Sequence, residues 1–152
     1  MLHCISLPEG KFGTNYPGAL FTNQLDVNAH PSFADLAGVE VAPHLLIDRD
    51  GDIEQFVGFD DAAWHAGVSQ WKHVSGCNNQ SIGIELEGDV SSAFTKDQYT
   101  ALVQVLLALI KRYPQLGVDT IVGHNDVACG RKQDPGPFFD WQGLLMELAT
   151  SA

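Results

Sequence analysis

The segment GHNDVACGRKQDPGPFFDW, residues 123–141, concentrates side chains that can bind metals or transfer protons. His124, Cys129 and Asp134 supply the three kinds of ligand atom that zinc takes in proteins. The glycines and prolines of the segment argue against a helix and predict a loop. Because rigid sheets present catalytic groups on such loops, the segment predicts a site for chemistry, with zinc as a candidate cofactor.

The segment holds a single histidine, so a further ligand must come from another part of the chain. No two histidines have the close helical spacing of the HExxH motif, which excludes a metalloprotease of that type. Composition alone does not choose among the remaining candidates, which are His3, His30, His44, His65 and His73.

The elements that must position this loop have the pattern of a sheet. Residues 41–58 predict two strands joined by an Asp-Gly turn at residues 49–52. In SIGIELEG, residues 81–88, apolar residues alternate with Gly83, Glu85 and Glu87, which is the period of a strand. One face of this strand is apolar and the other carries both carboxylates. A short strand at residues 120–122 is expected to lead the chain to His124.

Helical patterns lie before and after these strands. Thr95 followed by Gln98 predicts a capping box, and apolar residues recur at helical spacing up to Ile110, so a helix is expected here that ends at Pro114. A short helix is expected at residues 31–37, a last one at about 140–149, and an irregular surface loop at 7–29. The sequence therefore predicts an α/β fold: one domain, residues 1–152, with a mixed central β-sheet flanked by α-helices.

Charge limits the partners. Eight basic residues against nineteen acidic ones give a formal charge of −11, which repels phosphate backbones and anionic lipid. We therefore expect no nucleic acid and no membrane partner. We also expect a monomer. Three cysteines do not form a disulfide framework, and no secretory signal is recognisable near Met1. These features predict a cytoplasmic protein.

Several segments together resemble a known family. The chain is similar to AmpD-like, zinc-dependent N-acetylmuramoyl-L-alanine amidases (amidase type 2) and, more distantly, to peptidoglycan-recognition proteins. The resemblance covers most of the chain and rests on six stretches in the same order: HCISLPEGKFG, LFTNQLDVNAHPSF, HLLIDRDGDIEQFVGFDDAAWHAGVS, CNNQSIGIELEG, FTKDQY and GHNDVACGRKQDPGPFFDW.

The resemblance implies a catalytic zinc ion held by His3, His124 and Asp134, with its fourth position open for water. It implies Glu85 as the group that takes and returns a proton, and Lys132 as the group that stabilises the oxyanion. The substrate would be a muropeptide, in this branch a 1,6-anhydro-N-acetylmuramoyl peptide of peptidoglycan recycling. The bond cut would join the lactyl carbonyl of muramic acid to L-alanine.

The stretch AAWHAG matches a segment near the substrate cleft of the family, so Trp64 and His65 are expected to bind sugar or peptide. His65 could instead be a structural histidine.

Each of three other assignments also has an alternative. His3 could belong to a frayed end, Cys129 could replace Asp134 as the third ligand, and Glu87 could replace Glu85.

Two other functions remain open. A module of the same fold could bind muropeptide without cleaving it, and a wall-degrading lysin could act on polymeric peptidoglycan. The joint presence of ligands, Glu85 and Lys132 speaks against the first, and the acidic charge speaks against the second.

Overall fold

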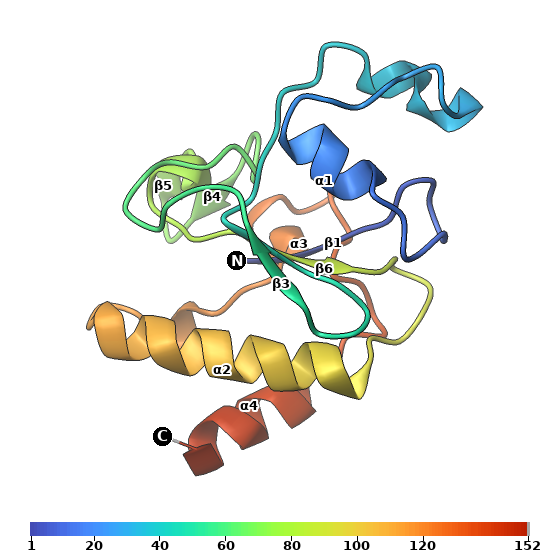
Figure 1. Cartoon of the computed structure of the whole chain (residues 1–152). Coiled ribbons are helices and arrows are strands. Elements are labelled where there is room, and N and C mark those ends of the chain that lie inside the picture. Colours follow the sequence, from blue (N-terminus) through green and yellow to red (C-terminus); the bar gives the residue numbers. More distant parts are fainter. Residues whose placement is uncertain (152) are drawn as a thin grey trace.

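A four-stranded sheet forms the centre of the computed structural model, which describes residues 1–151 (Figure 1). Its strand order is β1 (Leu2–Ile5), β6 (Ile84–Glu87), β2 (Leu45–Ile47) and β3 (Ile53–Gln55). The pairs β1–β6 and β6–β2 are parallel, whereas β2 and β3 form the expected antiparallel hairpin. The predicted α/β class with a mixed sheet is confirmed.

The register of the parallel strands divides their residues between two faces. Leu2, Ile84 and Leu45 are neighbours across β1, β6 and β2, and all three belong to the main hydrophobic core. One position further along, His3, Glu85 and Leu46 are neighbours. Because successive side chains of a strand point to opposite faces, this second set lies on the face away from the core. The alternation read from residues 81–88 is therefore confirmed.

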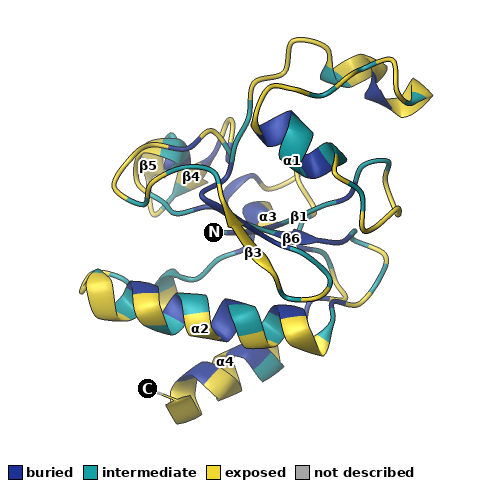
Figure 2. Cartoon of the chain, in the orientation of Figure 1, coloured by how far each residue is buried: buried dark blue, intermediate teal, exposed yellow. Residues whose placement is uncertain are grey.

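Two helices cover the apolar face. α2 (Lys96–Arg112) lies along the sheet, and α4 (Trp141–Ser151) packs against α2, so that the buried stripe of each helix faces the interior (Figures 1 and 2). The capping box of Thr95 and Gln98 is present at the start of α2. The main core joins Leu102 and Leu106 of α2 to Leu144 and Leu148 of α4. Burying each such side chain contributes about 1.5–3 kcal/mol.

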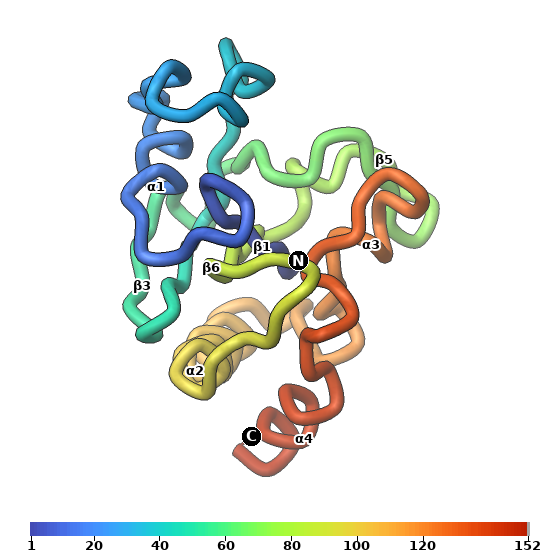
Figure 3. Tube along the Cα trace, turned by 90° about the vertical axis from the view of Figure 1, so that its right-hand side faces the viewer, coloured from blue at the N-terminus to red at the C-terminus, as the bar shows by residue number. Residues whose placement is uncertain are grey.

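A smaller layer covers part of the opposite face. α1 (Tyr16–Phe21) packs Leu20 and Phe21 against Leu46 of β2, and the 3₁₀ helix η1 (Pro31–Leu36) follows it. In the view of Figure 3, α1 lies on the other side of the sheet from α2 and α4. The expectation that residues 7–29 are wholly irregular was wrong, because six of these residues form α1.

The rest of the chain connects these layers through short elements. They are the hairpin of β4 (Gln70–Trp71) and β5 (Val74–Ser75), η2 (Cys77–Asn79), η3 (Val118–Thr120) and α3 (His124–Val127).

Two expectations for this region were wrong. The predicted strand at 120–122 is absent, since these residues make a single backbone hydrogen bond to β1, from Leu2 N to Val122 O at 2.8 Å. The predicted loop after Gly123 instead begins with the helical turn of α3. Within residues 1–151, no helix is long and apolar enough to cross a membrane.

Candidate metal centre

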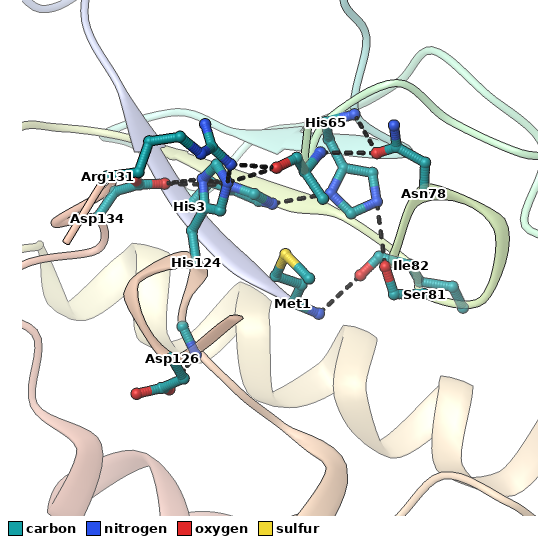
Figure 4. Close-up of polar contacts among 12 residues, drawn as sticks. Met1, His3, His65, Asn78, Ser81, Ile82, His124, Asp126, Arg131 and Asp134 are labelled. Carbon is teal, nitrogen blue, oxygen red and sulfur yellow. Dashed lines mark hydrogen bonds and ion pairs between the residues drawn. The ribbon is translucent and has the colours of Figure 1, made fainter. Parts of the chain in front are cut away.

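Three side chains from different parts of the chain converge beside β1. His3 Nδ1 lies 3.0 Å from His124 Nδ1 and 3.0 Å from Asp134 Oδ2, and His124 Nδ1 lies 2.9 Å from the same carboxylate oxygen (Figure 4). In residues 1–151 these three form the single group of histidine, cysteine or acidic side chains arranged to hold a metal ion. Of the five other histidines that composition left open, the fold selects His3.

The sheet and one loop bring the three residues together. His3 lies in the middle of β1 and is 1% exposed. Leu2 forms an isolated parallel bridge with Gly123, which places His124 beside His3. Asn125 N donates to Asp134 O at 3.0 Å, so the start of α3 holds the loop that carries the carboxylate. Gly123 leaves little room for a side chain, because a Cβ there would lie 2.9 Å from Cδ of the Pro135 ring.

The electrostatics of the cluster suit a cation. Burial lowers the pKa of His3 to about 4, although the Asp134 carboxylate opposes this shift, so the imidazole is neutral at pH 7. Burial alone would raise the pKa of Asp134, but its hydrogen bonds to His124 and His3 outweigh burial and hold that pKa below its usual range. Neutral imidazoles and an ionised carboxylate are the protonation states in which these groups bind metals.

The outward nitrogens of both histidines have partners of their own. His124 Nε2 lies 2.9 Å from Ala66 O, and His3 Nε2 lies 2.9 Å from His65 Nδ1 (Figure 4). A backbone carbonyl can only accept, so His124 donates from Nε2, and in the neutral ring the lone pair of Nδ1 faces the cluster. Such outer contacts orient the histidine ligands of metal sites.

Glu85 lies beside this cluster. It is the direct neighbour of His3 in the β1–β6 register, and its Oε2 is buried without a hydrogen-bond partner. Burial raises the pKa of Glu85 well above its ordinary value, the charge of Asp134 raises it further, and Lys132 partly offsets the rise. A buried carboxyl oxygen without a partner costs stability, which makes Glu85 a candidate for chemistry rather than for structure.

Glu87, the alternative to Glu85, has a structural role. Its carboxylate accepts from Gly13 N at 2.6 Å and from Arg49 N at 3.4 Å, which ties the loop after β1 and the β2–β3 turn to β6. The geometry therefore favours Glu85 as the reactive carboxylate.

Two further alternatives lose support from the positions of the side chains. Cys129 is exposed and its thiol points to Asp126 O at 3.6 Å, outside the cluster, which favours Asp134 as the third ligand. The alternative of a frayed His3 also loses support, because β1 pairs with β6 along its whole length.

The other predicted site residues are Lys132, Trp64 and His65. Lys132 is exposed on the loop that carries Asp134. Trp64 is 69% exposed, while its carbonyl accepts from Ala42 N at 3.1 Å, so the backbone is held and the indole is free. His65 lies behind His3, and its other ring nitrogen, Nε2, is 3.4 Å from Ser81 Oγ. Burial and the neighbouring His3 lower the pKa of His65 to about 2, so its ring is neutral.

Sequence reasoning missed the residues that support this arrangement. Asn78 Oδ1 accepts from the backbone N–H groups of His65 at 3.0 Å and Ala66 at 2.7 Å. Arg131 donates to Ala66 O and to Val68 O, each at 2.7 Å. Asn78 and Arg131 lie within the motifs that carry the family resemblance, but a single sequence gives no sign of their roles.

A large hollow in the described structure lies elsewhere. Its volume is about 570 Å³, and it is bounded by Trp71, Ile82, the C-terminal half of α2 and residues 115–122. Its walls contain none of the three converging side chains. The convergence of donor atoms, rather than the size of a hollow, therefore identifies the candidate site.

Comparison with known proteins agrees with this geometry. Residues 14–137 match the family described as N-acetylmuramoyl-L-alanine amidase. The 1,6-anhydro-N-acetylmuramyl-L-alanine amidase AmpD of Enterobacter cloacae is 49% identical over 152 residues, which are 100% of this chain and 81% of the relative.

Two solved structures extend the comparison. The crystal structure of a selenomethionine AmpD derivative has a TM-score of 0.95 at 49% identity, over 97% of this chain and 82% of that one. The amidase AmiD of E. coli, solved with anhydro-N-acetylmuramic acid-L-Ala-D-γ-Glu-L-Lys, has a TM-score of 0.67 at 34% identity, over 77% of this chain and 51% of that one. With a family match over most of its length and a relative of about half identity, the chain belongs to the N-acetylmuramoyl-L-alanine amidases.

Proposed function

We propose that this protein is a zinc-dependent amidase of peptidoglycan recycling. It hydrolyses the amide between N-acetylmuramic acid, in its 1,6-anhydro form, and the L-alanine of muropeptides. The observation that carries the proposal is the convergence of His3, His124 and Asp134 beside the unpartnered carboxyl of Glu85. The substrate is supported by the relatives, because AmpD is named for it and AmiD was solved with an anhydromuramoyl peptide.

The donor set fits zinc. Two imidazole nitrogens and one carboxylate oxygen are its usual protein ligands, and three of them leave a position open, as catalytic zinc requires. When bound by His3, His124 and Asp134, zinc supplies a Lewis acid and lowers the pKa of a water molecule toward neutrality.

Glu85 acts as the general base and then as the general acid. It takes a proton as water adds to the carbonyl carbon, and returns that proton to the alanine nitrogen as the C–N bond breaks. Its position next to His3 in the sheet supports this role, since β6 fixes the carboxyl beside the cluster. The products are a free lactyl carboxylate and a free peptide amine.

Lys132 stabilises the negative charge that develops on the carbonyl oxygen. Its ammonium group acts on Glu85 electrostatically and lies on the same loop as Asp134, which supports a place at the edge of the site. Removing one such donor typically costs about 10²–10³ in kcat.

Trp64 precedes His65 in the chain and offers an exposed indole, and we assign it to binding sugar or peptide. Aromatic faces suit this role because they give a large contact area with few rotatable bonds. Direct contact between His65 and substrate stays a prediction, since both of its ring nitrogens already have protein partners.

Residues 1–152 act as one amidase domain and as a monomer, because a single chain supplies all the proposed site residues. The charge of −11 supports a small muropeptide as partner rather than nucleic acid or a membrane surface. Free Cys4, Cys77 and Cys129 support a reducing, cytoplasmic location.

The test is mass spectrometry of 1,6-anhydro-N-acetylmuramoyl tripeptide incubated with the zinc-loaded protein, beside the non-anhydro analogue and polymeric peptidoglycan. We expect release of the tripeptide, loss of release with a chelator, and recovery with added zinc. Binding of the muropeptide without release would identify a binding module, and preferential attack on polymer would identify a wall lysin. Either result would overturn the proposal.

A further inference from the structure

His65 and Ala66 lie at the back of the metal cluster and contact both of its histidines. The side chain of His65 contacts His3 (Figure 4), and the carbonyl of Ala66 contacts His124. Asn78 Oδ1 accepts from both backbone N–H groups of this pair, so the two residues are held as a unit. His65, Ala66 and Asn78, three residues outside the donor set, thus form a support for the two imidazoles.

The direction of the hydrogen bonds in this support can be read from its far end. Ser81 Oγ lies 2.6 Å from Cys77 O, and a carbonyl can only accept, so the single hydroxyl proton of Ser81 points there. Ser81 therefore turns a lone pair toward His65 Nε2 at 3.4 Å, and the proton of His65 is placed on Nε2.

The same reasoning continues to the metal side. With its proton on Nε2, His65 presents the lone pair of Nδ1 to His3 Nε2 at 2.9 Å, so His3 is the donor in that contact. The proton of His3 is then on Nε2, and the lone pair of Nδ1 faces His124 and Asp134. The opposite tautomer of His65 would put a proton on the atom of His3 that has to bind the metal.

The packing around His65 leaves it little freedom. Its ring lies directly against Gly83 of the β6 segment, where an added Cβ would come within 2.4 Å of the ring. His44 approaches from another side, with ring centroids 5.8 Å apart, and its own ring nitrogens bond Asp61 O and Gly83 N. The absence of a side chain at Gly83 thus makes the space that His65 fills.

We propose that His65 is a positioning residue that fixes the tautomer of His3 for metal binding, and that Ser81 fixes the tautomer of His65. This inference rests on the proposed metal site, but not on the identity of the substrate. Loss of an outer-shell partner of a metal ligand typically costs about 10–100-fold in metal affinity.

The experiment measures zinc affinity at pH 7.5 by competition with a chromophoric chelator. We expect His65→Phe, which keeps a ring but offers no acceptor, to weaken zinc binding about 10–100-fold. His65→Gln, whose amide oxygen can accept from His3, is expected to restore part of that loss. Ser81→Ala is expected to weaken binding by about tenfold, whereas Ser75→Ala, at an exposed serine of β5, should leave it unchanged.

A second measurement needs no variant. Long-range ¹H–¹⁵N correlation spectra of the zinc-loaded protein report the tautomer of each histidine, and we expect His65 to be neutral with its proton on Nε2. A proton on Nδ1 of His65, or equal zinc affinity in His65→Phe and the unmodified protein, would overturn the inference. Failure of the unmodified protein to bind zinc would instead refute the proposed metal site, so the two failures are distinguishable.

Discussion

The Nδ1 atoms of His3 and His124 lie 3.0 Å apart, although 121 positions separate the two residues in the chain. The contact depends on β1, which pairs with β6 and also bridges Gly123 through Leu2. The candidate metal cluster therefore depends on the sheet, and the carboxylate of Asp134 is the one member that comes from a loop. Substitution of Asp134, the proposed ligand on the loop, is therefore the most informative test of the cluster.

Asp134→Asn keeps the shape of the side chain and removes its charge. Since loss of an outer-shell partner alone costs about 10–100-fold in metal affinity, loss of an anionic ligand is expected to cost about 100-fold or more. Zinc competition with a chelator measures this change, and Asp35→Asn, at an exposed residue of η1, is the matched control. Unchanged affinity in Asp134→Asn would point to a different third ligand, with Cys129 as the first candidate.

Glu85→Gln is expected to stabilise the metal-free protein at neutral pH. Burial and Asp134 raise the pKa of Glu85 well above its ordinary value of 4.5. Below pH 4.5 the carboxyl is protonated in both the folded and the unfolded chain. As pH rises, the unfolded chain ionises first, so the free energy of unfolding falls until the folded pKa is passed. Glutamine does not titrate, so the free energy of unfolding of the variant does not fall for this reason as pH rises.

Urea unfolding of chelator-treated protein at pH 4 and pH 7 measures the effect. Glu85→Gln should match the unmodified protein at pH 4 and exceed its free energy of unfolding at pH 7. The same substitution at exposed Glu54 of β3 is the control. Activity should move the other way and fall by about 10²–10⁴, the usual contribution of a general base. A less stable Glu85→Gln protein at pH 7 would contradict the electrostatic account.

The three thiols are expected to differ in reactivity. Cys129 is exposed and Cys77 is buried. Burial raises the pKa of the half-buried Cys4 thiol, and the charges of Glu85 and Asp134 raise it further. Because the thiolate is the reactive form, iodoacetamide at pH 8 should label Cys129 at least about tenfold faster than Cys4 or Cys77. Peptide mass spectrometry follows the labelling, and comparable rates at Cys4 and Cys129 would contradict the arrangement of β1.

Local periodicity predicted the parts of the fold that depend on neighbours in sequence. The strand at residues 81–88 and the helix after Thr95 follow from alternation and capping, which short stretches of chain determine. α1 was missed because its six residues are helical through the packing of Leu20 and Phe21 on Leu46, a contact that no local pattern encodes. The strand expected at residues 120–122 failed for the converse reason, since apolar residues there lack a partner ladder.

The candidate site also combines features that the sequence could predict with features that depend on tertiary contacts. His3, His124 and Asp134 could be named from motifs, but their convergence depends on β1 lying next to β6. No sequence pattern indicated a role for Ser81, because that role depends on its contacts with the carbonyl of Cys77 and the imidazole of His65.

Gln98 tests how firmly α2 is joined to the sheet. It is fully buried at the start of α2, where its Nε2 donates to Glu87 O at 2.8 Å and Ile47 O at 3.3 Å, and its Oε1 accepts from Thr95 N at 3.0 Å. Gln98→Leu keeps the volume and leaves these backbone groups without their partner, at about 1–3 kcal/mol for each group that stays unsatisfied. We therefore expect urea unfolding to show a loss of about 2 kcal/mol or more in the free energy of unfolding.

Gln104→Leu, at an exposed position of the same helix, is the control, and its free energy of unfolding should stay within about 0.5 kcal/mol of the unmodified protein. Equal free energies of unfolding in the two variants would mean that the bonds of Gln98 to β2 and β6 do not stabilise the contact.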